Sequence, residues 1–329
     1  MNAYAKVGAF LVLGTLLSSE AFAESRYSEW GPPVNLGCGS INSASDDLGP
    51  GTSKDGLSFY FASNRPAPGA QGGQDLYVAQ RASRDALWGA PNNLGPTVNS
   101  PLTENVVSLS RDGHWLFFNS NRPGSTLDVN GNSSVDIWAS YRQDVHDDFA
   151  WQTPVNLGPG VNTAGFDAGA SYFENEEGGA PLLFFGRGVS FATQGTTTDI
   201  WVAELLPDGT FGNARLVPEL NSPQGDQRPS IRFDGLEIFF YSNRPGSTVD
   251  ANGNPTTDIW VATRKDVSDA WDPPVNLGSV VNTGAADFNP HISGDGLTLY
   301  FASSRPGGCG GFDIYMTTRA KLKGESLSG

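Results

Sequence analysis

Five carboxylates recur at one position of a repeating pattern. Each lies five residues after a repeated Asn, and they are Asp47, Glu104, Asp167, Asp226 and Asp287. Like charges that stand close together repel, so such a set needs cations, raised pKa values or basic neighbours. If the fold gathers them around one axis, they form a ligand-facing ring at a channel mouth. In an enzyme Asp167, Asp226 and Asp287 would be the candidate catalytic acids and bases.

A repeated arginine offers these acids a second role. It ends an aromatic segment in every repeat, and the residues are Arg65, Arg122, Arg187, Arg244 and Arg305. An Arg–carboxylate pair within each repeat would hold loops together and leave no acid for a ligand. Repetition in every unit favours this structural interpretation, since a catalytic site usually breaks symmetry. Both interpretations stay open on the sequence.

Two loops carry alternating Asp and Asn around a glycine. Their candidate metal ligands are Asp128, Asn130, Asn132 and Asp136 in one loop, and Asp250, Asn252, Asn254 and Asp258 in the other. Such oxygen-rich spacing suits calcium, which takes six to eight oxygen ligands. The competing interpretation is an Asn-Gly turn in an extended hairpin. Calcium is therefore the one candidate cofactor, and no other is implied.

Histidine chemistry is sparse. The chain has His114, His146 and His291, and of these His291 lies closest to a repeated acid, Asp287. One histidine beside carboxylates could serve general acid–base catalysis, although a lone strand histidine is more often packed or solvated. The sequence holds no G-x-S-x-G, H-E-x-x-H or Walker-type motif.

The repeat itself identifies the elements that position these groups. The segment WGPPVNLG begins at Trp30 and returns in similar form from Trp88, Trp151 and Trp271, with a decayed copy from Phe211. A unit that recurs in this way along the chain is typical of solenoids and propellers.

Each repeat contains four strand-like segments. An Asp-Gly turn between apolar runs, as at Asp55 and Asp112, indicates a hairpin, and a third strand starts at Asp-Ile-Trp or a variant of it. The Trp segment supplies the fourth strand. Four antiparallel strands in each of five units predict an all-β, five-bladed β-propeller.

The segment DGLSFYFASNRP (residues 55–66) and its four echoes resemble the TolB-like, or WD-like, propeller repeat. The resemblance covers residues 30–319. It implies a β-propeller in the bacterial envelope or outside the cell. TolB itself has six blades and a second domain, whereas five repeats fill this chain, so its partner-binding role is not carried over.

The order of the segments predicts how the ring closes. The chain begins with an isolated fourth strand, residues 30–37, and its last repeat lacks one. The N-terminal strand should therefore complete the last blade, which removes two exposed sheet edges. Cys38 and Cys309 would then meet, and in an oxidising compartment a disulfide is expected. A reactive thiol pair or a metal site are the competing interpretations.

The N-terminal segment and the net charge limit the expected cellular location and the expected partners. Residues 1–23 have the basic, apolar and Ala-x-Ala features of a signal peptide, which leaves 24–329 as the propeller in the periplasm or secreted. The blades are expected at roughly 38–95, 96–158, 159–218, 219–278 and 279–319 plus strand 30–37. A net charge of −15 argues against nucleic acid, and no membrane span is expected.

Symmetric repetition without an asymmetric catalytic set favours a non-catalytic binding module. Its partner would be a protein or glycan of the cell envelope, and a monomer is expected. The alternative is a carbohydrate-active glycoside hydrolase or lyase with carboxylates in the central pocket, because five-bladed propellers include glycosidases. Fold alone does not choose between these functions.

Overall fold

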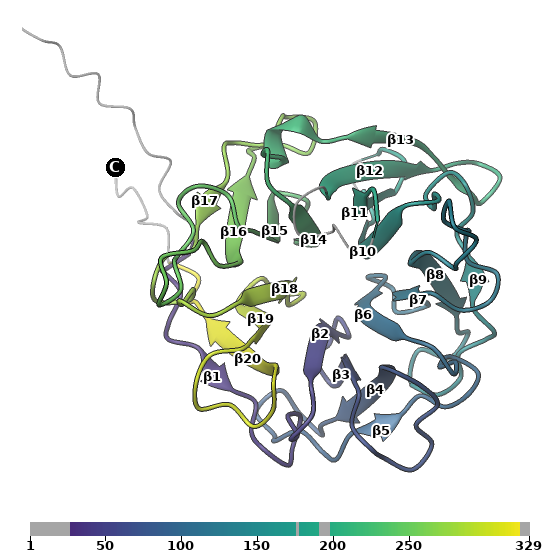
Figure 1. Cartoon of the computed structure of the whole chain (residues 1–329), viewed down its shortest axis with the longest axis horizontal. Coiled ribbons are helices and arrows are strands. Elements are labelled where there is room, and N and C mark those ends of the chain that lie inside the picture. Colours follow the sequence, from purple (N-terminus) through teal and green to yellow (C-terminus); the bar gives the residue numbers. More distant parts are fainter. Residues whose placement is uncertain (1–26, 176–177, 191–197, 323–329) are drawn as a thin grey trace, which may run out of the picture.

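The computed structural model describes residues 27–175, 178–190 and 198–322. Within these residues the chain forms five four-stranded antiparallel sheets that surround a common axis (Figure 1). The predicted all-β, five-bladed propeller is confirmed. The predicted signal peptide, residues 1–23, lies outside the described residues. No helix in the described ranges is long and apolar enough to span a membrane.

Each blade runs from an innermost strand to a short outer one, and β2, β6, β10, β14 and β18 surround the axis (Figure 1). One 3-10 turn, η2 (Pro218–Leu220), precedes the fourth blade. In order of blades, the strands are β2 (Asp47–Thr52), β3 (Ser58–Ser63), β4 (Asp75–Gln80) and β5 (Asn92–Asn93); β6 (Glu104–Leu109), β7 (Trp115–Ser120), β8 (Asp136–Tyr141) and β9 (Val155–Asn156); β10 (Phe166–Phe173), β11 (Leu182–Gly188), β12 (Asp199–Leu205) and β13 (Phe211–Leu216); β14 (Asp226–Ile231), β15 (Glu237–Ser242), β16 (Asp258–Thr263) and β17 (Val275–Asn276); and β18 (Asp287–Ile292), β19 (Thr298–Ser303), β20 (Asp313–Thr318) and β1 (Val34–Asn35).

The aromatic second strands form the core because both of their faces are covered by neighbouring blades. In β3, Tyr60 and Ala62 pack in a cluster with Leu116 of the second blade. The alternate residues, such as Phe59, pack instead against Tyr300 of the fifth blade. A strand that is buried on both faces is apolar at successive positions, which explains the continuous aromatic runs.

The repeated Asn joins consecutive blades. Asn99 accepts a hydrogen bond from the N–H of Leu76 at 2.8 Å and donates to its carbonyl at 3.0 Å. Asn42 bridges Ile314 in the same way, across the closure of the ring. Only a side-chain amide both donates and accepts in this geometry, which is why the position stays Asn in all five repeats.

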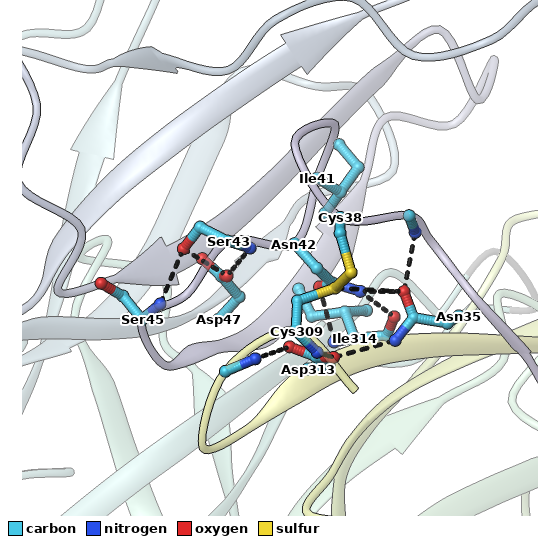
Figure 2. The surroundings of a disulfide bond; sticks show 12 residues. Asn35, Cys38, Ile41, Asn42, Ser43, Ser45, Asp47, Cys309, Asp313 and Ile314 are labelled. Carbon is cyan, nitrogen blue, oxygen red and sulfur yellow. Dashed lines mark hydrogen bonds between the residues drawn. A yellow bond between two sulfur atoms is a disulfide. The ribbon is translucent and has the colours of Figure 1, made fainter. Parts of the chain in front are cut away.

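The ring closes as the repeat order predicted. Strand β1 pairs antiparallel with β20, Val34 opposite Met316, so the first and last segments of the propeller lie side by side (Figure 1). The predicted disulfide between Cys38 and Cys309 is also confirmed, with Cα atoms 5.5 Å apart. Figure 2 shows it beside Asn35, whose amide donates to Asp313 at 2.9 Å.

Candidate functional site

The five repeated acids have no accessible surface. Every one pairs with the repeated arginine of its own blade, for example Asp167 with Arg187 at 2.7 Å and Glu104 with Arg122 at 3.0 Å. The second oxygen of Asp167 accepts the backbone N–H and the hydroxyl of Thr163, at 2.6 and 2.7 Å. Both oxygens of the carboxylate are therefore engaged within the blade.

The arginines of these pairs are equally constrained. Arg187 also donates to the carbonyl of Val161 and lies over the rings of Phe185 and Trp201, at 5.1 and 4.7 Å from their centres. The other four arginines repeat this arrangement with their own aromatic pairs. The structure thus places the acids and arginines as internal pairs, the structural interpretation, and does not present the ring to a ligand.

The acids expected to act in an enzyme, Asp167, Asp226 and Asp287, are buried and paired in the same way. Burial raises the pKa of Asp167 and of Asp287, against the opposing effect of their arginines. Asp226 is likewise buried and is paired with Arg244. A carboxylate without accessible oxygen cannot take a proton from, or give one to, a substrate in this conformation.

His291 joins the fifth blade to the first. Its Nε2 accepts the backbone N–H of Thr52 at 3.0 Å and lies 2.9 Å from the Thr52 hydroxyl. Burial lowers the pKa of His291 to about 4. It is therefore a neutral hydrogen-bond acceptor between blades at neutral pH.

The Asp/Asn loops are closed by their own backbone. Asp128 accepts the N–H groups of Asn130 and Asn132, at 2.8 and 2.9 Å, and Asp250 does the same in its loop. Asp136 is fully buried and accepts from Thr126 at 2.7 Å. Among the described residues no group of three or more His, Cys, Asp or Glu side chains could hold a metal ion. These contacts match the Asn-Gly turn interpretation, and calcium binding stays a prediction.

A feature that the sequence analysis missed lies two residues after each acid. The innermost strand of every blade has a register shift there, and the residue takes a left-handed φ between 51° and 70°. The five residues are Gly49, Val106, Gly169, Arg228 and Asn289. Glycine takes this conformation freely, whereas other residues are strained by roughly 1–3 kcal/mol. Val106, Arg228 and Asn289 therefore break the symmetry at the channel wall.

A large cavity opens beside this wall, where the long second-to-third-strand loops meet the channel. It has a volume of about 540 Å³. Its polar lining from the first, second and fourth blades includes Gln74, Asn105, Asn119, Asn121, Asp128 and Arg228. We call this cavity the amide cleft.

Three amides of the cleft form one directed hydrogen-bond chain. The N–H of Gly169 donates to Asn119 at 2.8 Å, Asn119 donates to Asn105 at 3.0 Å, and Asn105 donates to Gln74 at 2.9 Å. Because the first donor is a backbone N–H, it fixes which end of each amide is the oxygen. Asn119 is buried, whereas Asn105 and Gln74 are partly exposed and keep N–H groups that can donate to a ligand.

A second pocket of about 270 Å³ lies at the opposite end of the channel strands, among the first-to-second-strand turns. Burial and the nearby charge of Asp112 raise the pKa of Glu174 there. For Asp234, in the same pocket, burial acts upward but the hydrogen bonds from Arg232 outweigh it, and its pKa is lowered. This pocket holds carboxyl groups with unlike acidity.

No model of a known protein family matches the sequence. A search of curated proteins finds no match either.

Several solved structures share the fold. An α-L-arabinofuranosidase from Lactobacillus brevis is 14% identical, with a TM-score of 0.54 over 87% of this chain and 94% of that one. A thermostable family-43 glycoside hydrolase is 12% identical, with a TM-score of 0.54 over 87% and 92%. A GH62 hydrolase solved with xylotriose is 7% identical, with a TM-score of 0.53 over 90% and 99%. At these identities the likeness shows the fold alone.

TolB from Acinetobacter baumannii is 12% identical and has a TM-score of 0.49, over 89% of this chain and 63% of that one. The five four-stranded sheets of this chain support the resemblance to the TolB-like family only in its coarser form, a five-bladed propeller. The expectation of a non-catalytic binding module is corrected, because the solved structures with TM-scores of 0.53 and 0.54 named above are glycoside hydrolases. They favour the alternative interpretation.

Proposed function

We propose that this protein is a carbohydrate-active enzyme, a glycoside hydrolase, with the amide cleft as its sugar-binding site. The observation that carries the proposal is the cleft itself, about 540 Å³ at the end of the central channel and lined by oriented amides. Such a volume suits a small ligand or a few sugar units. Amide N–H groups are suitable donors to sugar hydroxyl and ring oxygens.

The fold comparison adds support of a different kind. The Lactobacillus brevis enzyme and the family-43 hydrolase share the fold of this chain over most of their length, and by their names they are an α-L-arabinofuranosidase and a glycoside hydrolase. Propellers host many functions, so this support depends on the cleft and does not replace it.

Asp128 is the carboxylate that lines the amide cleft among the described residues. The N–H of Asn132, together with that of Asn130, holds the pKa of Asp128 below its usual value. An ionised carboxylate acts in glycoside hydrolysis as the base, the nucleophile or the stabiliser of the positively charged transition state. We assign that role to Asp128.

The experiment offers arabinose- and xylose-containing oligosaccharides to the purified full-length protein and measures new reducing ends. Ultraviolet absorbance of an unsaturated product would identify a lyase instead. Asp128→Asn keeps the loop's hydrogen bonds, and we expect it to lower the rate by roughly 100-fold or more. Asp250→Asn is the matched control, because Asp250 caps the equivalent loop of the fourth blade and does not line the cleft.

Two outcomes would count against this assignment. No cleavage of any glycan would contradict the enzymatic proposal as a whole. A rate that falls in Glu174→Gln and is unchanged in Asp128→Asn would place the reaction in the opposite pocket.

The repeat type and the export of the protein are two further proposals. We propose that the repeat is of the TolB-like type and that the protein is exported to the periplasm or the medium after removal of residues 1–23. The Cys38–Cys309 disulfide supports an oxidising compartment. Mass spectrometry of the secreted protein, which should begin at Glu24, tests the cleavage.

A further inference from the structure

Arg228 is unlike the other buried arginines of the propeller. It is 8% exposed and lines the amide cleft, and in the part of the chain that the structure describes no carboxylate lies within ion-pair distance of it. Its Nε and Nη1 atoms have no hydrogen-bond partner among the described residues. Burial lowers its pKa, and the charge and hydrogen bond of Tyr241 act in the opposite direction. A buried guanidinium left without an anion is destabilising.

The backbone is also strained to place this side chain. Arg228 has a φ of 54°, at the position where the first and third blades have glycine. A Cβ on Gly169 would come within 2.8 Å of the Arg228 side chain, so the neighbouring blade leaves room for it. Strain and uncompensated charge at one residue are typical of a functional position.

We propose that Arg228 forms an anion subsite of the amide cleft, and that the substrate glycan carries an oxyanion, a carboxylate or a sulfate ester. This inference rests on the proposed function, since it names the substrate class of the same cleft. A guanidinium offers N–H donors in a planar fork that fits such oxyanions.

The rest of the cleft is consistent with an anion. The amide of Asn105, which is partly exposed and is oriented by the buried Asn119, keeps an N–H that can donate to ligand oxygens. Asp128, the one carboxylate of the described lining, is partly exposed, and its Oδ1 accepts two backbone N–H groups. Because the net charge is −15, the molecule as a whole repels anions, and any anion binding must be local.

The channel offers a matched pair of variants. Arg228→Gly removes the cation and leaves the residue that two other blades already use, so strain is relieved and the fold should persist. Asn289→Gly makes the same backbone change in the fifth blade, at a φ of 52°. Arg228→Lys keeps the charge but not the planar fork, and it serves if the glycine variant does not fold.

Calorimetry with the full-length protein would use three probes of one size: oligogalacturonate, its methyl ester, and a sulfated neutral oligosaccharide. We expect at least one anionic probe to bind, with affinity reduced roughly 10- to 100-fold in Arg228→Gly and only in part in Arg228→Lys. Asn289→Gly should bind as the wild type does. Which anionic probe binds decides between carboxylate and sulfate ester.

Other results would overturn the inference. Equal binding of the methyl ester and the acid, or unchanged affinity in Arg228→Gly, would show that solvent alone satisfies the guanidinium. Cleavage of neutral glycans with unchanged rate in Arg228→Gly would overturn the anion subsite while the proposed function stood. Arg228-dependent binding of an anionic probe without cleavage of any glycan would support the anion subsite and contradict the proposed hydrolase function.

Discussion

Single residues of this propeller illustrate how position in the blade changes the chemistry of a side chain. Asp167 and Asp128 are both aspartates near the channel, yet the first is buried against Arg187 and the second is partly exposed on a loop that lines the amide cleft. Burial raises the pKa of Asp167, whereas backbone N–H groups lower that of Asp128. Accessibility, and not residue type, separates a structural acid from a candidate catalytic one.

His291 gives a prediction at this scale. Its pKa of about 4 lies below the ordinary 6.5, so the unfolded chain binds the proton first as the pH falls. Stability from the neutral histidine is full above pH 6.5 and declines between 6.5 and about 4, by about 3 kcal/mol in total. In denaturant unfolding across this range the wild type should lose about 3 kcal/mol more than His291→Gln, because the carboxyl groups titrate in both proteins. Parallel curves would contradict it.

Between elements, a buried polar network joins the first two blades. Asp148, in the loop after β8, accepts from Arg142 at 2.7 Å and from Tyr60 and Ser58 of β3 at 2.5 Å. Arg142 and Asp148 are 1% and 3% exposed. Although burial acts to raise it, these hydrogen bonds lower the pKa of Asp148.

Asp148→Asn should therefore be costly. It leaves Arg142 buried without its counter-charge, and we expect a loss of about 3–5 kcal/mol in the free energy of unfolding. Asp147→Asn is the control, because Asp147 is exposed and should change stability by less than about 0.5 kcal/mol. Equal midpoints of urea unfolding for the two variants would refute this role of the network.

At the scale of the whole molecule, stability depends on how the ring is closed. The disulfide joins residues that are 271 positions apart in the sequence, and the β1–β20 pairing holds the same two ends of the propeller together. Without this closure, the outer edge of the fifth blade would be open and prone to pair with other chains.

The double variant Cys38→Ser with Cys309→Ser tests the closure. A long loop gains most from a crosslink, so we expect a loss of about 2–5 kcal/mol in guanidinium unfolding. Reducing agent should lower the wild type to the same midpoint and leave the variant unchanged. A wild type that is insensitive to reduction would show that strand pairing alone closes the ring.

The sequence determined the architecture because the blade is a local unit. Four strands, an Asp-Gly turn and the Trp segment recur within each repeat, so counting repeats predicted five blades, and the isolated strand at residues 30–37 predicted the closure and the disulfide. The sequence also supplied both roles for Asp167 and Arg187, but pairing depends on side-chain direction, which spacing alone does not decide. The burial of that pair is seen only in the tertiary structure. The same is true of the cleft that Gln74, Asn105, Asn119 and Arg228 line together. These four come from three blades, and contacts between blades are long-range, so no local pattern records them.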